Sequence, residues 1–469
     1  MAARLRRRAD GSARGLTRTA PGSGARPLTA IVIVAAAAAC LSLNWPGHFT
    51  WDSVVQLAEG RHGAYSGQHP PVMSWLLGLA DAAQPGAALF VALQTALVFG
   101  ALAAFVLVGR GSWLALLLAG LVASFPQLAI YPGIVWKDVL FAGAATAGFA
   151  CLAWAAAAWD RPAPRWALIA AAALLLALAT LARQNGVVVL PFAAAALGWL
   201  ARRKSGAQRG LAHGGGFLAA TAALVVAASA ALAPRVTGGD GVAEQWEHLE
   251  TYDIVGAMAR DPRLEFGVLK ARAPRLEALL REGGAPVYSP SRIDTLADPI
   301  FTETDGRPAL AQTVADQWRA LILLHPLLYL RERAAAFRWV LLTPKPSECV
   351  MAETGVDGDP DDLAAAGLKE RETGRDKALG DYAEAFTGTP VYSHALYGAA
   401  AIVFLIVLLR RRRDADIAVA AMLGGALAFA ASFAVISIAC DYRYLYFLDL
   451  AAIAAALYLA AGTRTQTAT

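Results

Sequence analysis

The sequence predicts an all-α polytopic membrane protein with about ten transmembrane helices. Of its 469 residues, 57% are hydrophobic and 16% charged, a composition that a soluble domain of this size could not carry on its surface. Apolar stretches of roughly 17 or more residues, enough to cross about 30 Å of hydrocarbon, recur along the chain. The predicted spans are 28–44, 87–108, 112–130, 139–158, 166–182, 187–200, 211–233, 395–409, 417–438 and 445–461.

Basic residues decide the orientation of these spans. With a cytoplasmic amino terminus, 19 basic residues lie in cytoplasmic segments, and the short outside loops hold only Arg61, Lys137, Arg183 and Arg443. The positive-inside rule therefore favours this orientation. Because the charges segregate by topology, the net charge of +5 does not indicate nucleic-acid binding.

The predicted spans divide the chain into four parts. We expect a disordered basic cytoplasmic tail, a transmembrane catalytic module with two outside loops, one large and mostly helical outside segment, and the last membrane helices. These parts are residues 1–27, 28–233 with loops 45–86 and 131–138, 234–394, and 395–469.

The first outside loop contains two predicted interfacial helices. Thr50 or Asp52 caps an apolar run that ends at Gly60. His69 precedes two prolines, which block a helix before them and allow one to start there. Asp52 is thus held close to the membrane surface.

The outside segment has two regions with distinct patterns. Residues 318–342 are apolar but carry charged residues, among them Arg331, Glu332, Arg333 and Arg338, so we expect helices lying on the membrane, broken at His325. Residues 344–380 are rich in Gly, Asp, Glu and Lys, which predicts an exposed loop. Cys349 and Cys440 are both expected outside, where a disulfide is permitted, but the sequence does not show whether they are close.

Asp52 and Asp138 come from different outside loops, at the boundary of the hydrocarbon. Two carboxylates on one face suit a general base and an orienting or metal-binding group. The alternative is that they are ordinary caps and turn formers, but ionisable residues near hydrocarbon tend to be kept for function. Asp449, inside the last span, is expected to be a structural residue paired with a hydroxyl or an Arg.

The outside cations Lys137, Arg183 and Arg443 suit the binding of an anion such as the phosphate of a lipid carrier. Contact with lipid headgroups is the alternative for each, and it is the role expected of Arg61 and His62. The chain has no HExxH, no His pair at i and i+4, and no CxxC, so no tightly held transition metal is indicated. A loosely held divalent cation between Asp52, Asp138 and a phosphate stays open.

Taken together, these short motifs resemble the GT-C superfamily of polytopic glycosyltransferases, which includes the protein mannosyltransferases, the aminoarabinose transferase of lipid A and many bacterial relatives. The resemblance covers most of residues 28–460. It rests on Trp51-Asp52, Tyr65, His69-Pro70-Pro71, Lys137-Asp138, Arg183-Gln184-Asn185-Gly186 and Arg443-Tyr444.

The resemblance implies transfer of a sugar from a polyprenyl-phosphate-linked donor to a lipid, glycan or protein acceptor at the outer face of a bacterial cytoplasmic membrane. Asp52 would be the base or orienting group and Asp138 the second acid. The substrate-binding residues would be Lys137, Arg183, Arg443, His69, Tyr65 and Trp51. Many relatives have a second acidic residue beside the first-loop Asp, and its absence here argues against a metal requirement.

Topology supports this donor independently, because the outer face has no supply of nucleotide sugars. The alternative function is a transporter or flippase for a lipid-linked or hydrophobic anion. Such a protein would need polar residues through the middle of its bundle and discontinuous helices near the midplane. The predicted spans are instead rich in Ala and Leu, and the polar groups gather on one face, which favours an enzyme.

Overall fold

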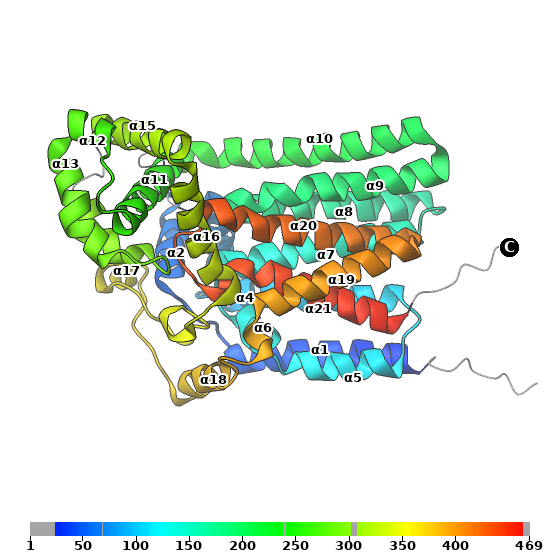
Figure 1. Ribbon diagram of the computed structural model, residues 1–469. Coiled ribbons are helices and arrows are strands. Elements are labelled where there is room, and N and C mark those ends of the chain that lie inside the picture. The colour runs from blue at the N-terminus through cyan, green and yellow to red at the C-terminus, as the bar shows by residue number, and fades with distance from the viewer. Residues whose placement is uncertain (1–23, 68, 238–240, 302–306, 463–469) are drawn as a thin grey trace, which may run out of the picture.

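The computed structural model describes residues 24–67, 69–237, 241–301 and 307–462, so the predicted tail of residues 1–27 lies almost wholly outside it. In this part, nine helices are long and apolar enough to cross a membrane, and they lie side by side (Figure 1). The chain is a multi-pass all-α membrane protein, as predicted. The nine helices are α1 (Ala25–Asn44), α4 (Ala88–Val108), α7 (Lys137–Ala157), α8 (Pro162–Ala182), α9 (Leu190–Ser205, preceded by the turn η2, Gln184–Val189), α10 (Ala207–Leu232), α19 (His394–Arg411), α20 (Asp414–Ile436) and α21 (Tyr446–Ala461).

The prediction of one continuous span over residues 112–130 is wrong. Helix α5 (Trp113–Ala123) ends before Pro126, and the chain then turns by 77° into α6 (Pro126–Ala129) and the turn η1 (Tyr131–Gly133). Pro126 explains the break, because proline lacks the backbone N–H that a continuing helix needs and is well suited to begin a new one. The bend leads the chain to the start of α7.

Helices α7 and α21 form the centre of the bundle. They are the most buried of the nine, and α7 packs against α4, α8, α20 and α21. Small residues allow this close packing in a membrane: a Cβ atom at Gly148 would lie 2.8 Å from Leu176. Both helices begin at the end of the bundle that the charge pattern predicts to face outside, which we call the outer end. Their first residues therefore have fixed positions relative to one another.

The first outside loop forms the helices α2 (Trp51–His62) and α3 (Pro71–Ala83). Thr50 and Ser53 make a capping box at the start of α2, so Thr50 rather than Asp52 is the cap. The two helices cross at Gly60 and Gly78, where a Cβ atom on Gly60 would lie 2.4 Å from the Ser74 carbonyl oxygen. This crossing fixes α2 and therefore the residues of its first turn.

The outside segment has its own hydrophobic core and gathers at one end of the bundle (Figure 1). Residues 318–342 form two helices that meet at His325, as expected, and do not form one span. The longer helices are α11 (Gly241–Arg260), α15 (Pro308–Leu324), α16 (Pro326–Leu342) and α18 (Gly374–Glu384), and the shorter ones are α12 (Gly267–Arg272), α13 (Pro274–Leu279) and α17 (Pro360–Ala365).

Arg333 of α16 joins the outside segment to the bundle. Its side chain is almost fully buried and donates hydrogen bonds to the carbonyl oxygens of Val435, at 2.9 Å, and of Ser437. These carbonyls lie at the outer end of α20, where a helix leaves acceptors unpaired. Arg333 also forms an ion pair of 3.2 Å with Asp253 of α11. One cation therefore binds two helices of the outside segment to the end of a membrane helix.

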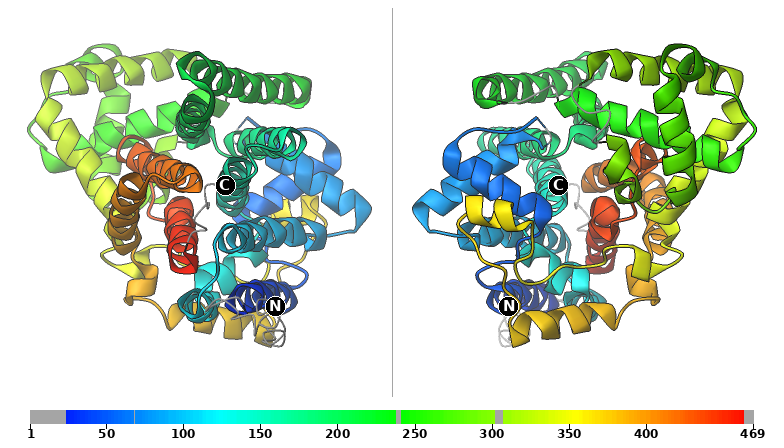
Figure 2. Two further views of the ribbon diagram at one scale, coloured as in Figure 1. Left: turned by 90° about the vertical axis from the view of Figure 1, so that its right-hand side faces the viewer. Right: turned by 90° about the vertical axis from the view of Figure 1, so that its left-hand side faces the viewer.

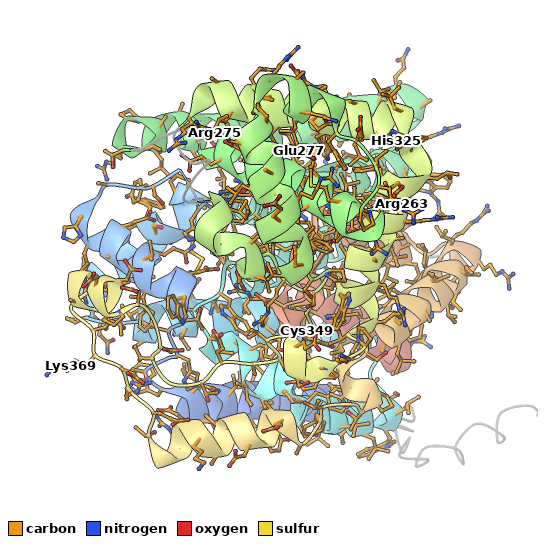
Figure 3. All side chains as sticks on the ribbon, turned by 60° about the vertical axis from the view of Figure 1, so that its left-hand side comes forward. Arg263, Arg275, Glu277, His325, Cys349 and Lys369 are labelled. Atoms are coloured by element: carbon orange, nitrogen blue, oxygen red, sulfur yellow. A yellow bond between two sulfur atoms is a disulfide. The ribbon has the colours of Figure 1, made fainter. Side chains whose placement is uncertain are left out.

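The prediction of an exposed loop over residues 344–380 is only partly correct. Residues 349–357, which we call the strap, cross the outer end of the bundle, and Gly355 and Val356 are buried. A disulfide joins Cys349, labelled in Figure 3, to Cys440. The Phe49 backbone N–H donates to the Gly355 carbonyl oxygen at 3.0 Å. The strap is thus fixed by a covalent bond and by backbone hydrogen bonds. Neither depends on apolar side chains, so a segment with the composition of an exposed loop can still be held in place.

Asp449 is a structural residue in the first turn of α21. It is fully buried, accepts a hydrogen bond of 2.7 Å from the Tyr442 hydroxyl, and lies 2.8 Å from Nδ1 of His394. The expected hydroxyl partner is present, and the second partner is His394 instead of an Arg. Because Tyr442 precedes Arg443, this buried pair fixes the segment that leads into α21.

We predict that Asp449→Asn lowers the free energy of unfolding by about 2 kcal/mol, because an amide turns one buried acceptor into a donor that faces His394 or Tyr442. Thermal unfolding of the purified protein in detergent measures this loss. The matched control is Asp160→Asn, which changes an exposed carboxylate in the loop between α7 and α8 and should leave the transition unchanged. Equal transitions for both variants would contradict the structural role.

Candidate functional site

The charged residues at the outer end of the bundle come from separate segments of the chain. Each is placed by an element described above or by the turn η10 (Tyr442–Leu445), which leads into α21. They are Asp52 in the first turn of α2, His69 before α3, Lys137 and Asp138 in the first turn of α7, Arg183 between α8 and η2, and Asp441 and Arg443 at η10.

Arg443 is the centre of an ion-pair network. Its guanidinium lies 3.1 Å from Asp52 and 3.1 Å from Asp441, and its Nε atom lies 3.9 Å from Oδ2 of Asp138. Asp138 forms a further ion pair with Arg183. Four residues predicted from separate outside loops are therefore joined in one continuous network.

Aromatic rings hold both arginines in place. The Arg183 guanidinium lies over the ring of Phe433 at 5.3 Å and over Tyr444 at 5.4 Å. The Arg443 guanidinium lies over Trp136 at 5.2 Å. Such faces attract a cation and restrict the orientation of its hydrogen-bond donors, so the donors of the two arginines are oriented before any ligand binds.

Lys137 is bound differently from the arginines. Its Nζ atom lies 3.3 Å from Nδ1 of His69, and among the ion pairs of the described residues none includes Lys137. Burial, followed by the charge of Lys137, lowers the pKa of His69 to about 4, so His69 is neutral at pH 7 and accepts at Nδ1. The charge of Lys137 therefore remains available to an anionic ligand.

Asp52 is ionised at neutral pH. Burial alone would raise the pKa of its carboxyl group, but the charges of Arg443 and Lys137 outweigh burial and hold this pKa well below the usual range. Its Oδ2 atom accepts a hydrogen bond from Arg443 at 3.1 Å. The Asp52 side chain is still 33% exposed, so a ligand has access to a carboxylate of fixed orientation.

Three other residues of the first outside loop lie apart from this network. Tyr65 is buried, and its backbone N–H donates to the Arg235 carbonyl oxygen at 2.8 Å. Trp51 is 54% exposed. Within the described residues, no hydrogen bond, ion pair or ring contact joins either to the network. Arg61, expected at lipid headgroups, instead pairs with Asp81 at 2.6 Å, because α2 and α3 cross there.

Glu353, on the strap, was not predicted to belong to this site. Burial raises its pKa to about 7; Arg443 opposes this shift, and the negative charges of Asp441, Asp52 and Asp357 add to it. Glu353 therefore changes charge near neutral pH beside the network. Its neighbours in the sequence have the pattern of an exposed loop, and hydrogen bonds between the strap and distant backbone groups decide where it lies.

The divalent cation left open by the sequence has no preformed site. The part of the chain that the structure describes contains no group of three or more His, Cys, Asp or Glu residues arranged to hold a metal ion. Asp52 and Asp138 are each bound to an arginine. To bind a cation between them, each carboxylate would have to release its arginine.

No family model matches the chain, and no curated protein matches it. Similar solved structures are an archaeal oligosaccharyltransferase, AglB from Archaeoglobus fulgidus, in complex with an inhibitory peptide and a dolichol-phosphate, and an Archaeoglobus fulgidus oligosaccharyltransferase in the apo form. The TM-scores are 0.38 and 0.39, with 16% identity over 92% of this chain. The chain spans 50% of the length of each. Similarity at this level assigns no activity, which must be inferred from the site itself.

Proposed function

We propose that the protein is a membrane glycosyltransferase that transfers a sugar from a polyprenyl-phosphate-linked donor to a lipid, glycan or protein acceptor. The observation that carries this proposal is the network around Arg443, in which cations and carboxylates from separate segments meet at the outer end of the bundle. A lipid-linked donor presents its phosphate and sugar at this level of a membrane.

The cations of the site suit the phosphate of such a donor. Among the described residues, no carboxylate lies within ion-pair distance of Lys137, so its charge is available to the phosphate. Arg443 has hydrogen-bond donors oriented by the ring of Trp136. Lys137 and Asp138 also lie at the amino terminus of α7, where the helix dipole favours an anion. Binding of a phosphate would let Arg443 share its donors between the ligand and Asp52.

Asp52 suits the acceptor. Within the described residues, its Oδ1 atom has no hydrogen-bond partner, while Oδ2 is held by Arg443. We infer that Oδ1 accepts a hydrogen bond from the acceptor hydroxyl. The hydroxyl oxygen attacks the anomeric carbon, the bond from that carbon to the phosphate oxygen breaks, and the proton passes to Asp52. Lys137 and Arg443 offset the charge that develops on the departing polyprenyl phosphate.

A transporter is less well supported by the position of the charges. Asp449, the buried carboxylate in the first turn of α21, is taken by His394 and Tyr442. The charged residues of the network around Arg443, Asp52 and Asp138 among them, also lie at the outer end. This asymmetry suits chemistry at the membrane surface better than passage through the bundle.

We predict that Asp52→Asn lowers turnover at least about 100-fold, because an amide cannot take the proton of the acceptor. Turnover is measured as release of polyprenyl phosphate from a panel of polyprenyl-phosphate sugars, with a membrane extract as the source of acceptor. Asp81→Asn, in the same outside loop but paired with Arg61, is the control and should retain activity. Full turnover by a folded Asp52→Asn protein would refute the role of Asp52.

We predict that Lys137→Met raises the KM for the donor about tenfold or more, because the site loses a cation that forms no ion pair with any carboxylate of the described residues. The control Lys204→Met removes a lysine that pairs with Asp414 at 2.8 Å at the opposite end of the bundle and should leave KM unchanged. An unaltered KM in the Lys137 variant would place the donor phosphate elsewhere.

We predict that the KM for the donor rises roughly three- to tenfold as the pH passes upward through about 7. Glu353 is neutral below its pKa of about 7 and negative above it, and this new charge competes with the donor phosphate for Arg443. Glu353→Gln should remove the pH dependence, whereas Glu348→Gln, which changes an acid that pairs with Lys345, should retain it. Identical profiles for the two variants would exclude Glu353 as the cause.

A further inference from the structure

The corner between α15 and α16 exposes a group of leucines, which we call the leucine corner. Leu323 is 78% exposed, Leu324 72%, Leu327 70% and Leu330 57%. These residues are outside the nine membrane-spanning helices, and they lie on both sides of the break at His325. Apolar side chains gathered in this way at one exposed corner indicate an interaction surface.

The leucines of this corner do not belong to the hydrophobic core of the outside segment. The core side of α15 is occupied by Leu321, which is 1% exposed, and Leu328 and Tyr329 of α16 pack on the same core. The exposed leucines point away from that core. A different partner must therefore cover them.

Arg333 fixes the level of the corner relative to the membrane. Its hydrogen bonds to the Val435 and Ser437 carbonyl oxygens place it at the outer end of α20. Leu330 and Leu327 precede Arg333 on α16 by three and six residues, which is roughly 5 and 9 Å along a helix. The leucine corner is thus close to the level at which the membrane helices end.

The corner also extends sideways beyond the bundle. Seen along the membrane helices, the segment containing α15 and α16 reaches past the outline of the spanning helices (Figure 2). His325 lies at the edge of the outside segment (Figure 3). A membrane around the bundle would therefore place lipid beneath the corner.

The exposed face of α16 has the composition of a helix at a lipid surface. Leu327, Arg331, Ala334 and Arg338 are exposed at helical spacing on one face. In an interfacial helix, leucines enter the acyl region, and arginines reach the phosphates of the headgroups. A cavity of about 200 Å³ lies beside the corner, and its lining, which includes Phe266, Leu321 and Leu324, is mostly apolar.

We propose that the leucine corner inserts into the outer leaflet of the membrane and that α16 lies along the lipid headgroups. Lipid at the corner would then hold the outside segment in addition to the strap and to Arg333 at the end of α20. This inference does not depend on the reaction that the site performs, because it uses only the position and the chemistry of the corner.

The experiment places a bimane fluorophore on the full-length chain after the free cysteines Cys40 and Cys151 have been replaced by serine. The label is attached at Leu327→Cys and, in a second protein, at Leu324→Cys, so that the test survives if one variant fails to fold. The control position is Lys270→Cys on α12, an exposed residue of the same outside segment. The proteins are reconstituted in vesicles of phosphatidylcholine and phosphatidylglycerol with and without acyl-chain spin-labelled phosphatidylcholine.

We expect the spin-labelled lipid to quench bimane at positions 327 and 324 at least about twofold more than at 270, with the reverse order for iodide added in water. Equal quenching by the lipid at the corner and at position 270 would overturn the proposal. Protection of position 327 from both quenchers, together with cross-linking of two copies of the Leu327→Cys protein by a thiol-reactive reagent, would also overturn it by identifying a second copy of the chain as the partner.

Discussion

The structure of the site depends on the balance of charge around Arg443. A guanidinium at the edge of the hydrocarbon is stable only if its charge is compensated, and here Asp52 and Asp441 provide that compensation from different segments. Asp52 in turn stays ionised because the charges of Arg443 and Lys137 are close to it. The ion pair between the two residues Asp52 and Arg443 joins the first outside loop and the start of α21 in one electrostatic unit.

This unit is held by elements of very different kinds. Buried helices fix Lys137 and Asp138, aromatic rings orient Arg183, and the pair of Asp449 with Tyr442 holds the turn that carries Arg443. The outside segment contributes through its backbone, because the strap contacts the first loop by hydrogen bonds between main-chain atoms. A rigid arrangement of charges is useful in catalysis because little reorganisation is needed when a ligand binds.

Most of the spans could be predicted because hydropathy is a local property of the sequence. Asp52, Lys137, Asp138, Arg183 and Arg443 could be selected because they interrupt the apolar pattern on the face that otherwise lacks charge, and the structure brings them together. The bend at Pro126 was missed, although proline gives a local signal, because the residues on both sides are apolar. Glu353 and the strap were missed for another reason: their pairing joins segments about 300 residues apart, as in the hydrogen bond between Phe49 and Gly355, and no local pattern records it.

The disulfide between Cys349 and Cys440 has a consequence for the life of the protein in the cell. Such a bond forms where thiols meet an oxidising environment, which the cytoplasm does not supply. Its two cysteines are 91 residues apart and flank the helix pair α19 and α20. The strap can therefore be locked beside Arg443 only once α19 and α20 have been inserted into the membrane and both cysteines lie on the same side of it.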